Sequence, residues 1–284
     1  EQYSAMAGAL AQLAGKLGQA GLPDPRREEK VAQLFAGLGL DALECSVTSD
    51  LAGRLTAAVT IARTRFTEEE IKALTAEVSR ICRRDMDLPE VTHCRTVTML
   101  TFGERPLFTA TFGTAGRPAK GQNVSGDALD CFCDTSGRAQ LLLCDGMGTG
   151  RPAAVDGNLA AELTARLLKA GIPAELAARL VNVALALKSE EESGATLDLI
   201  SVDLYTGTTR LFKAGAAPGF LVHGGRARAV GDVSLPMGIL GGVNGQSRVV
   251  HLCAGDYAVL VSDGLLVDGT AWVAKQLELS AAAG

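Results

Sequence analysis

Residues 125–150 read SGDALDCFCDTSGRAQLLLCDGMGTG, and this stretch decides the fold. The run Leu141-Leu142-Leu143-Cys144 is short and continuously apolar, which is typical of a buried strand. Asp145 follows it directly, so its carboxylate is expected at the end of that strand, where a sheet opens to solvent. Gly146 lets the backbone turn sharply there and expose its carbonyl. Asp127 precedes the neighbouring segment, so two acids are expected near each other.

The same pattern returns downstream, where the apolar run Tyr257–Val261 ends in Ser262-Asp263-Gly264. Carboxylates together with a backbone carbonyl suit Mg²⁺ or Mn²⁺ and suit zinc poorly. An Asp-Gly pair after a strand is more commonly a simple turn. Three acid-bearing segments in one chain favour a metal site at one end of a sheet sandwich, but their spacing alone leaves both interpretations open.

Six motifs follow one another along the chain: Ser125-Gly126-Asp127, residues 145–150, residues 195–199, residues 213–218, residues 235–240 and residues 261–264. Their order and number resemble the bacterial branch of the PPM (type 2C) metal-dependent Ser/Thr protein phosphatases. Within that family, the DGMGTG and KAGAAP segments most resemble the phosphatase region of the stage II sporulation protein E family. The resemblance covers roughly residues 41–275.

The resemblance implies a two-ion site and assigns roles to four residues. Asp145 would bridge two Mn²⁺ or Mg²⁺ ions, Asp127 and the Gly146 carbonyl would complete one site, and Asp263 would bind the other. Two divalent ions activate water and neutralise charge on a phosphoryl group. Replacing Asp145 or Asp263 by Asn is therefore expected to lower the rate by orders of magnitude.

One departure from the family pattern concerns a further Asp, which the family carries in an Asp-Asp-Met-Thr-like segment. After Asp263 the sequence offers only Asp268 and Glu278, neither in that context. We therefore expect the last strands and the last metal ligand to be missing from this sequence, which could leave it inactive. A phosphatase-fold module that regulates by docking, without turnover, stays open as the alternative function.

Substrate, partner and location follow from the resemblance alone. It implies a phosphoserine substrate, specifically a phosphorylated anti-anti-sigma factor whose dephosphorylation releases a sporulation sigma factor. It also implies a cytoplasmic domain of a bacterial membrane protein at the cell membrane and division septum. The sequence has no signal peptide and no run of about 18 apolar residues, so the membrane region would lie outside it.

Composition excludes several other classes. The chain has 284 residues, a net charge of −5 and 47% hydrophobic residues, which indicates a globular fold and disfavours a nucleic-acid partner. Its seven Cys match no zinc pattern, and none is followed by Arg six positions later, as cysteine-dependent phosphatases require. We expect buried thiols of a reducing compartment. The three His are isolated and are expected to be ordinary surface or sheet residues.

The pattern along the chain predicts an α+β fold, namely a PPM-type sandwich of two antiparallel β-sheets flanked by helices, with an amino-terminal helical regulatory segment. Residues 1–40 are predicted as two helices, which either pack on their own domain or serve as a switch or homodimerisation element. Residues 41–284 are predicted as the phosphatase domain without its carboxy-terminal strands. Hairpins are predicted at 96–113, 196–213 and 220–230, and a capping box at Thr67 and Glu70.

Two further features of the sequence each admit two interpretations, and a third argues against nucleotide binding. Arg117 and Lys120 precede Asp127 and would either hold a phosphate oxygen or be solvated loop charges. Asp198 would either support the site from behind the ligands or be structural. Residues 145–150 lack the Gly-Lys-Ser/Thr ending of a nucleotide-binding loop, so that function is disfavoured.

Overall fold

The computed structural model describes residues 21–63, 65–118, 121, 124–134, 136–188, 194–231, 234–238 and 245–282. The chain divides into two compact units, one ending at Pro106 and one covering Leu107–Gly284. We call them the amino-terminal unit and the carboxy-terminal unit and describe each by itself. The predicted helix over residues 1–22 lies almost wholly outside the described residues.

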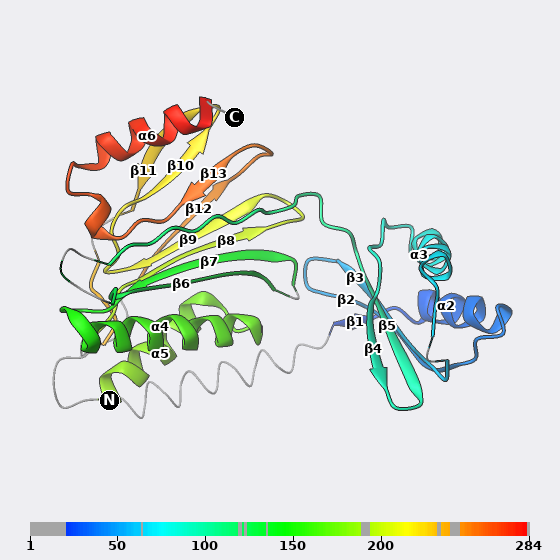
Figure 1. Cartoon of the computed structure of the whole chain (residues 1–284). Helices are drawn as coiled ribbons and strands as arrows, with labels where there is room; N and C mark the ends of the chain where they lie inside the picture. The colour runs from blue at the N-terminus through cyan, green and yellow to red at the C-terminus, as the bar shows by residue number, and fades with distance from the viewer. Residues whose placement is uncertain are drawn as a thin grey trace. The chain divides into compact units, whose positions relative to one another are not determined.

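The amino-terminal unit is an antiparallel five-stranded sheet with two helices (Figure 1). The strand order is β1-β2-β3-β5-β4. Side chains of both helices and of the sheet share one apolar core, in which Val31, Phe35, Val78, Leu100 and Phe102 are fully buried. The elements are β1 (Leu22–Pro23), α2 (Pro25–Gly37), β2 (Ala42–Ser49), β3 (Leu55–Ile61), α3 (Glu68–Cys82), β4 (Glu90–Cys94) and β5 (Val97–Gly103).

Helix α3 begins at the predicted capping box. The Thr67 side chain accepts a hydrogen bond from the Glu70 backbone N–H, and the Glu70 carboxylate accepts one from the Thr67 backbone N–H. This exchange satisfies two backbone donors that a helix start otherwise leaves unpaired. The helix ends where Arg83 adopts a left-handed conformation with φ of 53°.

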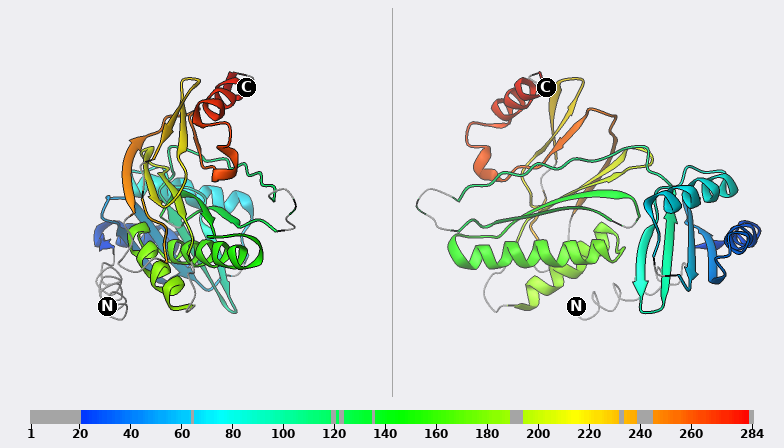
Figure 2. Two further views of the ribbon diagram at one scale, coloured as in Figure 1. Left: turned by 90° about the vertical axis from the view of Figure 1, so that its left-hand side faces the viewer. Right: turned by 45° about the vertical axis from the view of Figure 1, so that its right-hand side comes forward.

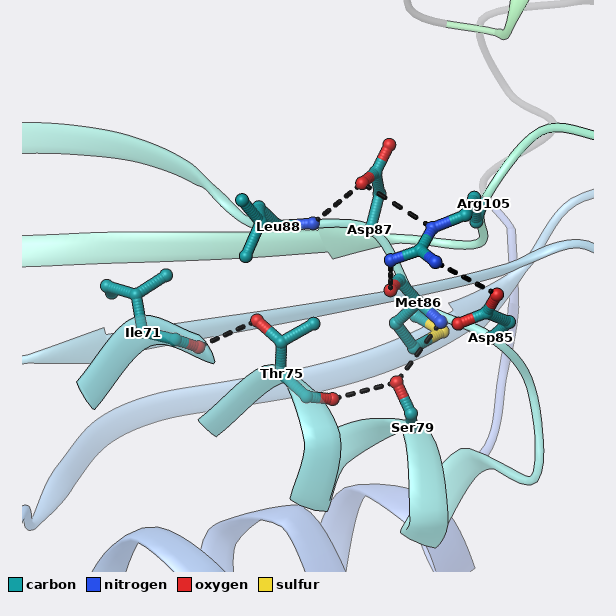
Figure 3. Close-up of polar contacts among 8 residues, drawn as sticks. All are labelled: Ile71, Thr75, Ser79, Asp85, Met86, Asp87, Leu88 and Arg105. Carbon is teal, nitrogen blue, oxygen red and sulfur yellow. Dashed lines mark hydrogen bonds and ion pairs between the residues drawn. The ribbon is translucent and has the colours of Figure 1, made fainter. Parts of the chain in front are cut away.

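A polar network holds the connection from α3 to β4 against the end of β5 (Figure 3). Ser79 Oγ donates to the Thr75 carbonyl at 2.7 Å and accepts from the Met86 N–H at 3.1 Å. The Arg105 guanidinium donates to Asp85 at 3.2 Å and lies 3.7 Å from Asp87. These contacts join α3, the α3–β4 connection and the residue after β5 within the amino-terminal unit.

The carboxy-terminal unit contains two antiparallel sheets and three α-helices among its described residues. One sheet has the order β12-β9-β8-β7-β6 and the other β11-β10-β13. The elements are β6 (Asp127–Cys133), β7 (Arg138–Asp145), α4 (Gly150–Lys169), α5 (Ala174–Lys188), β8 (Leu197–Asp203), β9 (Thr208–Ala214), β10 (Gly219–His223), β11 (Arg226–Val230), β12 (Gln246–His251), β13 (Tyr257–Val259), a 3-10 turn η1 (Asp263–Leu265) and α6 (Thr270–Ala282).

The layers of this unit run helix, sheet, sheet, helix (Figures 1 and 2). Helices α4 and α5 bury Ala160, Ala165, Val181 and Leu185 against the five-stranded sheet. Ile200, Leu211 and Val230 fill the space between the two sheets, and Phe220 packs with Val273 of α6 on the far side. The predicted α+β sandwich flanked by helices is confirmed.

The structure corrects one local prediction. Residues 107–113 form no strand, so the hairpin predicted over 96–113 is wrong, and β5 pairs instead with β3 and β4. The Pro106 turn leads out of the amino-terminal unit, and Phe108 makes a backbone hydrogen bond of 2.9 Å to the Leu204 carbonyl. The hairpins β8–β9 and β10–β11 form as predicted.

The division into compact units falls after Pro106, and the domain boundary at residue 40 stays a prediction. Strands β2, β3 and β5 fall within the range predicted as the phosphatase sandwich, yet they pack with α2 and α3 in a core whose members all lie between Val31 and Phe102. Alternating apolar residues specify a half-buried strand but do not say which sheet receives it. The regulatory role given to residues 1–40 stays a prediction.

Candidate metal centre

The ends of strands β6 and β7 bring Asp127 and Asp145 together. They form the terminal pair of the β6–β7 ladder, directly opposite each other. Ser125 Oγ donates to the Asp127 carboxylate at 3.3 Å, and the Asp145 N–H donates to Thr196 Oγ1 at 2.9 Å. The Asp145 carbonyl in turn accepts from the Thr196 N–H at 2.8 Å. Thr196, just before β8, thus holds both the backbone N–H and the backbone carbonyl of Asp145.

A third acid, Asp263, lines the same small cavity as Asp145. Burial raises the pKa of Asp145 to about 6, with further contributions from the negative charges of Asp127 and Asp263 and from a hydrogen bond shared with Asp127. Asp263 begins the short turn η1 and is exposed, whereas Asp127 and Asp145 are half-buried. The predicted strand before it is shorter than expected, because β13 ends at Val259.

Three glycines make room for this arrangement. A Cβ atom on Gly126 would lie 3.1 Å from Asp145 Oδ1 and 3.5 Å from the Gly146 carbonyl oxygen, so these two oxygens converge over Gly126. A Cβ atom on Gly146 would lie 1.8 Å from the Ala153 carbonyl oxygen, and one on Gly157 would lie 2.2 Å from the Gly126 carbonyl oxygen. The first two turns of α4 therefore pack directly on the backbone of the acidic loop.

The donor set fits a hard divalent cation. The described residues contain no group of three or more His, Cys, Asp or Glu side chains that could hold an ion by themselves. Mg²⁺ nevertheless often binds through one or two carboxylates and keeps several waters. Asp127, Asp145 and the Gly146 carbonyl provide such a set, and Asp263 is close enough to perturb the pKa of Asp145.

A buried ion pair lies behind the acids. Asp198 and Lys213 face each other across β8 and β9, and their side chains are only 1% and 4% exposed. Burial raises the pKa of Asp198 to about 6, against the lowering effect of Lys213. Sequence reasoning singles out Asp198 but misses Lys213 as its partner. The predicted β8–β9 hairpin carries the signal, because its register places the two residues opposite each other.

Other candidate residues lie away from this centre or outside the described residues. Arg117 is exposed, and Lys120 is not among the described residues. Glu278 accepts a hydrogen bond from the Ala227 N–H at 3.0 Å and so supports the α6–β11 contact, while Asp268 is exposed. All seven Cys are free, and burial raises the pKa of the Cys144 thiol well above its usual range, which opposes a thiolate nucleophile.

A sequence model of the family described as stage II sporulation protein E (SpoIIE) matches residues 135–283, more than half of the chain. The chain belongs to the SpoIIE family. The resemblance drawn from the motifs is confirmed.

Two curated SpoIIE relatives match over different lengths. The protein of Bacillus subtilis (strain 168) is 25% identical over 242 residues, covering 84% of this chain and 29% of the relative. The protein of Priestia megaterium is 28% identical over 166 residues, covering 58% of this chain and 28% of the relative. The chain thus spans less than a third of the length of these SpoIIE proteins.

Solved structures establish the fold. The PP2C phosphatase domain with a fragment of the regulatory domain of SpoIIE from Bacillus subtilis superposes with a TM-score of 0.68 at 22% identity, covering 98% of this chain and 84% of that one. The RsbU and RsbW domains of a Mycobacterium tuberculosis protein match with a TM-score of 0.50 at 23% identity, over 58% of this chain and 48% of that one. This SpoIIE-family chain therefore has a PP2C-type phosphatase fold.

No helix among the described residues combines the length and apolar character needed to cross a bilayer.

Proposed function

We propose that this chain is a metal-dependent protein serine/threonine phosphatase that hydrolyses phosphoserine on an anti-anti-sigma factor. The observation that carries the proposal is the pairing of Asp127 with Asp145 beside the Gly146 carbonyl, with Asp263 close enough to raise the pKa of Asp145. Family membership supports the reaction class, and the substrate rests on the resemblance alone.

The chain's own residues would prepare the site for the reaction. Divalent Mn²⁺ or Mg²⁺ bound there would supply water activation and charge neutralisation. Asp145, held by Thr196, would keep its carboxylate at the strand end, and Asp127 would share the ligand set with the Gly146 carbonyl. Asp263, on a separate turn, would contribute its carboxylate to a second ion position.

The same reasoning extends to partners and location. A solved structure that combines a PP2C domain with a fragment of a regulatory domain covers 98% of this chain, which supports a regulatory role for the amino-terminal unit as a whole. We further propose homodimerisation through the amino-terminal helices and attachment to the cell membrane at the division septum, through regions outside this sequence.

The test is release of phosphate from a phosphoserine anti-anti-sigma protein with Mn²⁺ and with EDTA. The wild-type chain is compared with Asp145→Asn, Asp263→Asn, the exposed control Asp268→Asn, and a form extended beyond residue 284. We expect Mn²⁺-dependent release that falls by orders of magnitude in the first two variants and is unchanged in the control. Equal release by Asp145→Asn and the wild-type chain would overturn the site assignment.

A second candidate is a phosphatase-fold docking module without turnover. It predicts that neither this chain nor the extended form releases phosphate, while both still bind the anti-anti-sigma protein in calorimetry.

A further inference from the structure

A small cavity adjoins the candidate metal centre. Its volume is about 60 Å³, and its lining includes three carboxylates, those of Asp145, Asp198 and Asp263. Thr196, Ser262 and residues 215–217 also line it. One water needs on the order of 10–15 Å³ of such space together with two or more polar partners. The cavity therefore has the room and the polarity to hold water.

Only one of the two carboxylate oxygens of Asp198 accepts a hydrogen bond in the described part of the chain. Its Oδ2 atom accepts a hydrogen bond from Lys213 Nζ. Its Oδ1 atom is buried and has no hydrogen-bond partner in the described part of the chain. A buried acceptor without a donor is unfavourable, and such atoms in native proteins are commonly hydrogen-bonded to water. Asp198 is one of the residues that line the cavity, so the cavity is the space nearest to this oxygen in which a water could act as donor.

Lys213 links Asp198 to the cavity wall. Besides Asp198, its Nζ donates to the Ala217 carbonyl at 2.7 Å. The same loop is held from its other end, where the Gly215 N–H donates to Ser234 Oγ at 2.9 Å. Gly215 has φ of +68° and lies against Pro236, so this backbone has little freedom to move. One lysine thus fixes both the carboxylate and the wall of the cavity.

We propose that Asp198 and Lys213 are a positioning pair for the candidate site. Asp198 Oδ1 accepts a hydrogen bond from water in the cavity and orients that water between Asp145 and Asp263. Lys213 holds Asp198 in place and anchors the Ala217 segment opposite it. This inference rests on the proposed phosphatase function and assigns to it two residues that are not metal ligands.

A purely structural ion pair would affect stability alone, and a double variant separates the two roles. Replacing both partners of a buried ion pair by apolar residues of similar volume is often neutral or stabilising. Asp198→Leu combined with Lys213→Met should therefore fold as the wild-type chain does. It should nevertheless lose about 10–100-fold in kcat and in Mn²⁺ affinity, as loss of residues that orient metal ligands does. Arg210→Met, on the same strand β9, is the matched control and should change neither.

A second variant, Asp198→Asn, tests the proposal even if the double variant does not fold. Asn has the shape of Asp, and its amide oxygen would face Lys213, so its NH₂ group would face the cavity and replace an acceptor by a donor. Asp198→Asn should therefore lower kcat with KM nearly unchanged, and it should weaken Mn²⁺ binding in calorimetry.

The outcomes distinguish this inference from the proposed function. Wild-type kcat and Mn²⁺ affinity in a folded double variant would overturn the positioning pair while leaving the phosphatase intact. If no chain hydrolyses phosphoserine, the proposed function fails, and calorimetry alone decides the pair. Weaker Mn²⁺ binding by the two variants then supports it, and unchanged binding, or no binding by the wild-type chain, overturns it.

Discussion

Asp145 destabilises the metal-free fold at neutral pH. Its pKa is about 6 in the folded chain, against an ordinary value of 3.8, so the folded state binds more protons than the unfolded state between these values. Stability therefore falls as pH rises from about 4 to about 6, and the loss is complete above that range. Asp145→Asn should raise the free energy of unfolding by about 1 kcal/mol at pH 7.5, after a discount for solvent screening.

Urea denaturation in EDTA at pH 4.5 and pH 7.5 measures this effect. The gain should shrink strongly at pH 4.5, and exposed Asp268→Asn should show no comparable change at either pH. A variant that is less stable than wild type at pH 7.5 would show that burial of this carboxylate is not unfavourable.

Gly146 has a steric role that can be tested apart from chemistry. A methyl group there would overlap the Ala153 carbonyl, only 1.8 Å from the Cβ position, so α4 would have to move. Gly146→Ala should lower the free energy of unfolding by about 3 kcal/mol, the upper range for overpacking. Thermal unfolding measures this change. A Cβ atom on Gly264, beside Asp263, has no atom within 4 Å, so Gly264→Ala should be nearly neutral in the same measurement. Equal effects of the two changes would refute the packing argument.

At the scale of elements, the contribution of the α3 capping box to helix stability can be measured. Thr67→Ala removes the acceptor for the Glu70 N–H and should cost about 1 kcal/mol of helix stability. Hydrogen exchange should quicken in the first turn, Glu68–Ile71, and Thr67→Ser should restore protection. Unchanged exchange in Thr67→Ala would mean that tertiary packing alone fixes the helix start.

Elements with strong local signals are predictable, and elements defined by distant partners are not. Thr67 and Glu70 mark a helix start, and Thr206-Gly207 marks a hairpin turn, because a few neighbouring residues determine each. Strand β4 escapes prediction because its five residues are all exposed and show no apolar alternation. The strand expected at 107–113 does not form, because none of the strands that the structure describes pairs with these residues.

The candidate site divides in the same way. Asp127, Asp145 and Asp263 follow from acid-glycine motifs at strand ends, and these motifs can be read from sequence. Two features of the site depend on side-chain geometry across two strands and a loop. One is the Asp198 Oδ1 atom that lacks a hydrogen-bond donor among the described residues, and the other is the pair of hydrogen bonds from Lys213 Nζ to Asp198 and to the Ala217 carbonyl. No local pattern encodes that geometry.

At the scale of the whole molecule, the two units have separate cores, so a core defect should stay within its unit. Leu74 of α3 is 4% exposed, and Leu74→Ala should cost about 2–5 kcal/mol. Hydrogen exchange should quicken across the amino-terminal unit and change little in β6–β9. Leu51→Ala, at a position 83% exposed, is the control. Equal acceleration in both units would show that they unfold as one.

The close approach of Gly126, Gly146 and Gly157 bears on how such a site changes over evolutionary time. In the proposed site the acids serve chemistry and one of them destabilises the metal-free fold, whereas the glycines serve packing. A lineage released from selection for turnover would therefore lose its acids first and keep its glycines. Glycines without acids would then mark a descendant that has kept the fold and abandoned the reaction, and a family in which both decay together would contradict this order.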